Sequence, residues 1–105
     1  MKTYPAPEHV DRVTLRSEEV TTMCPITGNP DFYTVEISYE PSERVLCTKA
    51  LKEWFTSQRE EGYSCETFCR EVFNLALAEL EPRSLYVRIR QVPRGGIGIV
   101  AEAST

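Results

Sequence analysis

The residues with the clearest chemical potential are Cys24 and Asp31, which flank a segment rich in proline and glycine. Proline and glycine exclude this segment from a helix interior or a central strand, so we expect the thiol to lie in a loop. A loop thiol becomes a nucleophile when its pKa falls, and a nearby carboxylic acid can supply a proton. The same pair is also compatible with a packing cysteine and an aspartate that starts a strand, and one cysteine with one aspartate is too weak a motif to decide between the two interpretations.

The other cysteines favour packing over chemistry. Cys65 and Cys69 are four residues apart in a helical pattern, which could place two zinc ligands on one face. Cys24 and His9 could complete such a site. However, both helical cysteines belong to an apolar stripe, the paired CxxC motifs of zinc modules are absent, and free cysteine is commonly a small buried side chain. We therefore expect no metal site, and Cys47 shows no distinctive pattern.

Four charged residues could bind a ligand. Glu66 falls in the first turn of a predicted helix, where the dipole stabilises a carboxylate, and it could also accept the N–H donors of a purine-type base. Lys49, Lys52 and Arg94 lie near the ends of predicted elements, and two glycines follow the arginine. An arginine fork suits a phosphate, but neither a GxGxxG nor a P-loop motif is present, so surface lysines and a hairpin turn explain these residues as well.

Two helices and four strands are predicted to position these residues. Alternating apolar residues predict strands at 10–16, 31–40, 85–90 and 97–101. Residues 1–9 are interpreted as an extended arm, and residues 17–30 as a long connection of the kind that often carries function.

The helices lie between the second and third predicted strands. Thr48 is the expected N-cap of the first helix and Gly62 its end. Ser64 is the expected N-cap of the second, which shows apolar residues at steps of three and four until Pro82 stops it. The order strand, strand, helix, helix, strand, strand indicates an α+β domain in which both helices cover one face of an antiparallel sheet. The polar opposite face is either solvated or buried against identical subunits.

Length and composition set the class of protein. The 105 residues suffice for one domain, and the 41% hydrophobic and 27% charged content is typical of a globular protein. The net charge of −4 argues against binding of nucleic acid by bulk electrostatics. No apolar run is long enough to span a membrane and the first residues lack the apolar core of a secretory signal, so we expect a cytoplasmic protein with reduced thiols.

The segment Cys24–Phe32, CPITGNPDF, resembles the CPxTGxPDF segment of the nitrile reductases that act on 7-cyano-7-deazaguanine in queuosine biosynthesis. The similarity continues in the same order through Thr48–Lys52, Gly62–Glu66 and Pro93–Ile97. This resemblance implies a tunnelling fold of order ββααββ. It also implies a homo-oligomer in which the sheets of several subunits close into a barrel, with active sites at subunit interfaces.

The resemblance also implies residue roles. Cys24 would be the nucleophile that attacks the nitrile carbon, and Asp31 would protonate the nitrogen to give a covalent thioimidate. Glu66, preceded by Cys65, would bind the deazapurine. Three cations would contact NADPH, whose two successive hydrides give the aminomethyl compound: Lys49, Lys52 and Arg94.

Two positions depart from the family pattern. Cys47 and Thr48 stand where the usual Glu-Ser-Lys-Ser-Leu-Lys signature begins, and Cys65 stands where a histidine commonly precedes the substrate-binding glutamate. A related amidinotransferase branch instead adds ammonia to the thioimidate, on a nucleobase already in a nucleic acid, without NADPH. A third interpretation is a non-catalytic deazapurine-binding assembly protein, against which the intact Cys24 and Asp31 argue. Because the three cations are retained, we expect the NADPH-dependent reduction of the free nitrile.

Overall fold

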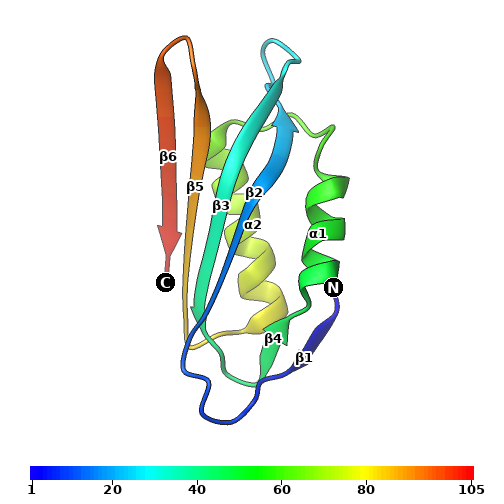
Figure 1. Ribbon diagram of the computed structural model, residues 1–105, viewed down its shortest axis with the longest axis vertical. Coiled ribbons are helices and arrows are strands. Elements are labelled where there is room, and N and C mark those ends of the chain that lie inside the picture. Colours follow the sequence, from blue (N-terminus) through cyan, green and yellow to red (C-terminus); the bar gives the residue numbers. More distant parts are fainter.

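Four long antiparallel strands form a sheet that runs the length of the molecule (Figure 1). Their spatial order is β2 (Val13–Met23), β3 (Pro30–Glu40), β5 (Ser84–Arg94) and β6 (Ile97–Ser104). The computed structural model describes residues 1–105. The strands alternate between buried apolar residues and exposed polar ones, as a sheet with one covered face requires. The predicted antiparallel sheet is therefore confirmed.

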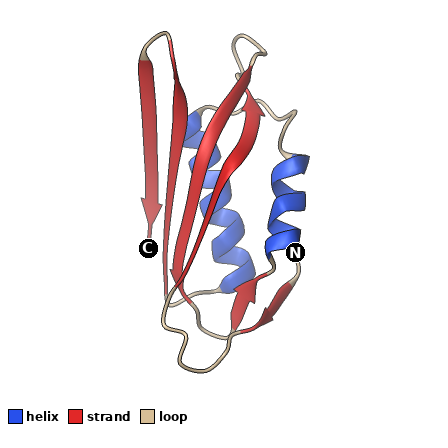
Figure 2. Cartoon of the chain, in the orientation of Figure 1, coloured by secondary structure: helices blue, strands red, loops and turns tan.

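Helices α1 (Thr48–Ser57) and α2 (Cys65–Leu80) both lie on one face of this sheet (Figure 2). The apolar stripe of α2 is buried against β5 and β6, and its residues Phe68, Val72 and Ala76 are fully inaccessible to solvent. This confirms the α+β arrangement with two helices on one side. Neither helix is long and apolar enough to cross a membrane.

Strand β2 is longer than predicted, because it continues through Met23 into the segment that we expected to be a connection. The pairing with β3 shifts between Ser17 and Val20, where a β-bulge interrupts the alternation of side chains. Beyond the bulge, Val20 and Thr22 again point into the core. The prediction of a long connection over 17–30 was therefore wrong, and only residues 24–29 form the loop.

Part of the predicted extended arm forms a short strand. Its strand β1 (Thr3–Pro5) pairs antiparallel with β4 (Arg44–Leu46), which was not predicted. The guanidinium of Arg44 donates to the hydroxyl oxygen of Thr3 and to its carbonyl oxygen at 2.9 Å. The arm is thus attached to the chain immediately before α1.

The ends of α1 differ from the prediction, whereas those of α2 agree with it. The N-cap of α1 is Cys47 rather than Thr48, and the helix ends at Ser57, before Gly62. The N-cap of α2 is Ser64, whose hydroxyl accepts a hydrogen bond from the backbone N–H of Thr67 at 3.2 Å. Glu81 follows α2 in the left-handed conformation, with φ of 43°.

Candidate active site

The loop between β2 and β3 holds Cys24 in a defined position. The backbone N–H of Cys24 donates to the carbonyl of Asn29 at 2.8 Å, and that of Gly28 donates to the carbonyl of Cys24 at 2.9 Å. Gly28 has a φ of 72°, a conformation that side chains disfavour, so glycine is needed for this tight turn. The proline and glycine residues that identified the segment therefore build a closed loop around the thiol.

This loop lowers the pKa of the Cys24 thiol from its ordinary value of 9.0 to about 7. The largest cause is the hydrogen bond with the Thr27 side chain, followed by the backbone N–H groups of Thr27 and Ile26. Burial opposes the shift, and Arg94 contributes a further hydrogen bond that favours the thiolate. The lowered pKa favours the thiolate at neutral pH, and the thiolate is the form that acts as a nucleophile.

The carboxylate of Asp31 lies at the start of β3, where the residue is only 4% exposed. Arg94 donates from Nη1 to Asp31 Oδ1 at 2.5 Å and from Nη2 to the hydroxyl oxygen of Thr27 at 3.4 Å. The hydrogen bond to Asp31 raises the pKa of Arg94, so the guanidinium keeps its charge. The structure thus brings Cys24, Asp31 and Arg94 together, and adds Thr27 as their common neighbour.

A single parallel bridge joins Met23 to Gly62 and brings the start of α2 to this loop. Met23 donates its N–H to the carbonyl of Glu61 at 2.9 Å and accepts from the N–H of Tyr63 at 3.1 Å. The Gly62 backbone lies beside Pro25, and a Cβ added at Gly62 would be in ordinary van der Waals contact with Pro25 at 3.6 Å. The turn after α1 is therefore fastened beside the nucleophile loop.

Cys65 and Glu66 follow this turn and point in different directions. Cys65 is 1% exposed, and its sulfur lies 4.0 Å from the carbonyl oxygen of Ile89. Burial raises the pKa of Cys65 to about 11, and the charges of Glu66 and Asp31 add to this effect. Glu66 is exposed and lines a groove between α2 and β6. Cys65 therefore belongs to the core beneath the site, whereas Glu66 is open to a ligand.

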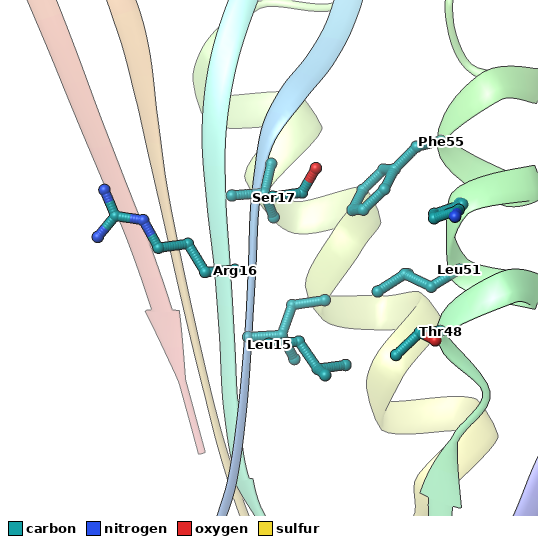
Figure 3. Close-up of a pocket in the computed structure, with 9 residues that line it drawn as sticks. Leu15, Arg16, Ser17, Thr48, Leu51 and Phe55 are labelled. Carbon is teal, nitrogen blue, oxygen red and sulfur yellow. The ribbon is translucent and has the colours of Figure 1, made fainter.

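Lys49 and Lys52 are exposed on α1 and make no hydrogen bond or ion pair with Cys24, Asp31 or Arg94. Lys52 also lines a pocket of about 160 Å³ between α1 and the strands β2 and β3 (Figure 3). The remaining wall of this pocket is largely apolar and includes Leu51 and Phe55. The structure therefore does not bring the two lysines to the Cys24 cluster within one chain.

Three residues near the site escaped the sequence analysis. Thr27 lies inside the CPITG segment, but a threonine in a loop gives no sign that it will contact a thiol and a guanidinium. Thr22, which pairs with Asp31 in the sheet, and Tyr33, two residues beyond Asp31, form a buried hydrogen bond of 2.9 Å between their hydroxyl oxygens. Thr22 was missed because it was assigned to a connection. No three His, Cys, Asp or Glu side chains lie close enough together to hold a metal ion.

Comparison with curated proteins finds relatives along nearly the whole chain. The NADPH-dependent 7-cyano-7-deazaguanine reductase of Syntrophus aciditrophicus is 39% identical, over 98% of this chain and 75% of the relative. The protein of the same name from Frankia casuarinae is 35% identical, over 99% of this chain and 83% of the relative. These identities extend beyond the CPITGNPDF segment, so the similarity does not depend on that motif alone.

Solved structures and family models agree with this result. The crystal structure of the archaeosine synthase QueF-Like in the apo form superposes with a TM-score of 0.86 at 20% identity, covering 93% of this chain and 96% of that one. This likeness confirms the predicted tunnelling fold. The family model described as QueF-like protein matches residues 30–105. The chain therefore belongs to the QueF-like protein family.

Proposed function

We propose that this protein is an NADPH-dependent reductase that converts the nitrile of 7-cyano-7-deazaguanine into an aminomethyl group. One observation carries the proposal: a loop thiol with a pKa of about 7 lies in the same hydrogen-bonded cluster as a buried aspartate. The names of the relatives from Syntrophus aciditrophicus and Frankia casuarinae support the same reaction.

The covalent step uses Cys24 and Asp31. The Cys24 thiolate attacks the electrophilic nitrile carbon, so that a carbon–sulfur bond forms while one carbon–nitrogen π bond breaks. Asp31, which is ion-paired with Arg94, takes the proton of the Cys24 thiol and passes it to the nitrogen, and the product is a neutral thioimidate bound to the enzyme. The hydrogen bonds from Thr27 and Ile26 that favour the thiolate prepare the nucleophile before substrate binds.

Glu66 is proposed to orient the deazapurine. Its exposed carboxylate can accept two neighbouring N–H donors of the base, the pattern that a guanine-like ring presents. Cys65 precedes it and packs into the core. Cys65 is therefore proposed to support the substrate pocket from below by filling the space behind Glu66.

The cations of the chain fit NADPH. Arg94 is 37% exposed at its side chain, precedes a glycine turn with positive φ, and is firmly protonated. Lys49 and Lys52 are exposed on α1, so the three would hold the phosphate groups of the cofactor. Two molecules of NADPH, bound one after the other, would each supply one hydride, and the two hydrides with two protons account for the conversion of nitrile to amine.

The separation of the lysines from Cys24 is best explained if the active site is completed between subunits. We therefore propose a homo-oligomer in which sheets join edge to edge and α1 of one copy contributes to the site of another. The four cysteines are free thiols, which fits the reducing environment of the cytoplasm, where we place the protein.

Mass spectrometry tests the covalent step. Mixing the protein with 7-cyano-7-deazaguanine in the absence of NADPH is expected to add the mass of one nitrile to Cys24, with a new near-ultraviolet absorption band. Cys69→Ala is the matched control, since it removes another thiol and is expected to keep the adduct. An unmodified Cys24 at saturating nitrile would overturn the mechanism.

The second half of the reaction is tested separately. Addition of NADPH to the adduct is expected to oxidise the cofactor and release the amine. If NADPH remains unused while ammonia yields an amidine on a nucleic acid that carries the cyano base, the protein is an amidinotransferase. Binding of the nitrile without an adduct or either product would identify a deazapurine-binding assembly protein.

A further inference from the structure

The sheet face opposite the helices carries a row of four charges, one from each strand. The register pairs Arg16 with Glu36, Glu36 with Arg88, and Arg88 with Glu102. Arg88 Nε lies 3.7 Å from Glu102 Oε1. The signs alternate across the sheet, so each inner charge has an opposite charge on both sides. We call these four residues the charge row.

The neighbouring row on the same face consists entirely of hydroxyl side chains. Thr14 pairs with Ser38, Ser38 with Tyr86, and Tyr86 with Ser104. The hydroxyl of Thr14 lies 3.2 Å from that of Ser38, so the row is connected at the β2 side. The two rows give the uncovered face a regular polar pattern that runs from one edge of the sheet to the other.

The edge strands end the charge row with opposite signs. In one chain, β2 and β6 each have a neighbour on one side only, so both keep a free set of backbone groups. Arg16 lies on β2 with 60% of its side chain exposed, and Glu102 lies on β6 with 54% exposed. Figure 3 shows the side chain of Arg16 extending away from α1.

We propose that the charge row sets the register in which copies of this chain join: β2 of one copy adds to β6 of the next, with Arg16 opposite Glu102 of the adjoining copy. The inference rests on the self-assembly included in the proposed function. Because all four strands alternate in direction, β2 of an added copy runs antiparallel to β6. The sheet then continues without a change of pattern.

This register agrees with both faces of the sheet. It places Thr14 opposite Ser104, which extends the hydroxyl row, and Leu15 opposite Ala103 on the helix-covered side. A shift of this register by one residue would place the polar face of one copy on the same side as the helix-covered face of the next. A shift by two would place Glu102 opposite either Glu18, with like charge, or Thr14, without charge. Arg16 opposite Glu102 is therefore the register that joins opposite charges.

The role of the charge row is selection rather than affinity. Exposed ion pairs contribute little to stability, whereas like charges directly opposite each other on two strands oppose pairing. Backbone hydrogen bonds between the two free edges would supply most of the attraction, as in other cases of strand addition. Each junction then admits one register because the alternatives lack the opposite charge.

Two complementary variants test this inference. Arg16→Glu and Glu102→Arg each place like charges at every junction, so each alone is expected to need an at least about tenfold higher concentration to assemble. In an equimolar mixture, β2 of the first variant meets β6 of the second and the reverse, so every junction regains opposite charges. Native mass spectrometry is expected to show assemblies of wild-type size that contain both variants.

Controls of matched charge change are Arg83→Glu and Glu43→Arg, which lie outside both rows and are expected to assemble as wild type does. Circular dichroism melts report whether each variant is folded. Folded single variants that assemble normally, or a mixture that remains unassembled, would overturn the register while leaving the reductase proposal intact. A monomeric wild-type protein would overturn both this inference and the proposed assembly.

If either single variant fails to fold, the fourfold inversion Arg16→Glu, Glu36→Arg, Arg88→Glu, Glu102→Arg replaces it, because that variant keeps opposite charges within the chain. It is expected to form assemblies of wild-type size and to exclude wild-type subunits from them. Assemblies in which the two chains mix at random would overturn the inference. Adduct formation on Cys24, measured on the same samples, reports the chemistry independently.

Discussion

Arg94 Nη1 lies 2.5 Å from Asp31 Oδ1, so the tip of the β5–β6 hairpin is fastened to the first residues of β3. The same guanidinium reaches Thr27 in the loop before β3. One arginine therefore joins three segments around Cys24, and it is both a neighbour of the nucleophile and a proposed cofactor ligand. Both roles can be tested by replacing this arginine.

Replacement of Arg94 by Met is expected to affect both roles. Loss of its hydrogen bond to Cys24 raises the thiol pKa, and loss of its positive charge weakens NADPH binding. We expect the KM for NADPH to rise by about tenfold or more, the loss of one charged hydrogen bond. Steady-state kinetics measures this, and Arg83→Met serves as the control because Arg83 lies beside the end of β3 far from Asp31, where its N–H donates to the carbonyl of Glu40. An unchanged KM would remove Arg94 from the cofactor site.

The reactivity of Cys24 is expected to depend on pH with a midpoint near 7. The lowered pKa favours the thiolate, so alkylation by iodoacetamide rises as the pH passes upward through about 7 and is slow below it. Cys65 is expected to remain unreactive over this range, because burial raises its pKa to about 11. Peptide mapping by mass spectrometry distinguishes the two sites.

The side chain of Thr27 is expected to be the largest single contributor to that lowered pKa. Thr27→Val removes the hydroxyl hydrogen bond, the largest cause of the shift, and the alkylation midpoint is expected to move toward 9.0. Thr34→Val makes the same side-chain change on the uncovered face of the sheet and serves as the control. A midpoint that stays near 7 in Thr27→Val would show that the backbone N–H groups of the loop suffice.

Cys24 is expected to be required for the reaction, and Cys69 for stability. Cys24→Ala should abolish the nitrile adduct with little effect on folding, since the thiol lies in a loop. Cys69→Ala should keep the adduct but lower the free energy of unfolding by about 1 kcal/mol, because it leaves a small cavity where a 2% exposed side chain packs against the core. Urea denaturation followed by circular dichroism measures the difference.

The buried hydroxyl pair offers a test of the core beneath the site. Tyr33→Phe leaves the Thr22 hydroxyl buried without its partner and is expected to cost about 1–3 kcal/mol of stability. The double change Tyr33→Phe with Thr22→Val removes both polar groups and is expected to cost less than the sum of the single changes. Strict additivity in denaturant unfolding would mean that the two hydroxyls do not interact.

The sequence predicted those parts of the fold that depend on periodicity. The apolar stripe of α2 and the alternation in β3 and β5 are clear in the sequence, because one face of each element is buried along its length and the other face is not. The second half of β2 was missed because its bulge places Glu18 and Glu19 where alternation would require an apolar residue. Strands β1 and β4 are three residues each, too short to produce a period.

The candidate site was predicted as a set of residues but not as an arrangement. Cys24 and Asp31 were recognisable because proline and glycine around them define the loop. The ion pair between Asp31 and Arg94 joins residues 63 apart in the chain, and no local pattern reports such a contact. The same holds for the isolation of the two lysines on α1, which depends on how the helices lie on the sheet.

The bridge between Met23 and Gly62 connects the nucleophile loop to the turn after α1. Met23 immediately precedes the nucleophile loop. The bridge pairs Met23 with Gly62, which lies in the turn after α1. That helix presents Lys49 and Lys52 to solvent, and the two hydrogen bonds at Met23 are the contacts through which a movement of its C-terminal turn would reach the Cys24 loop. The helix that carries the two lysines and the loop that carries Cys24 are therefore linked within one chain by the backbone hydrogen bonds of a single short turn.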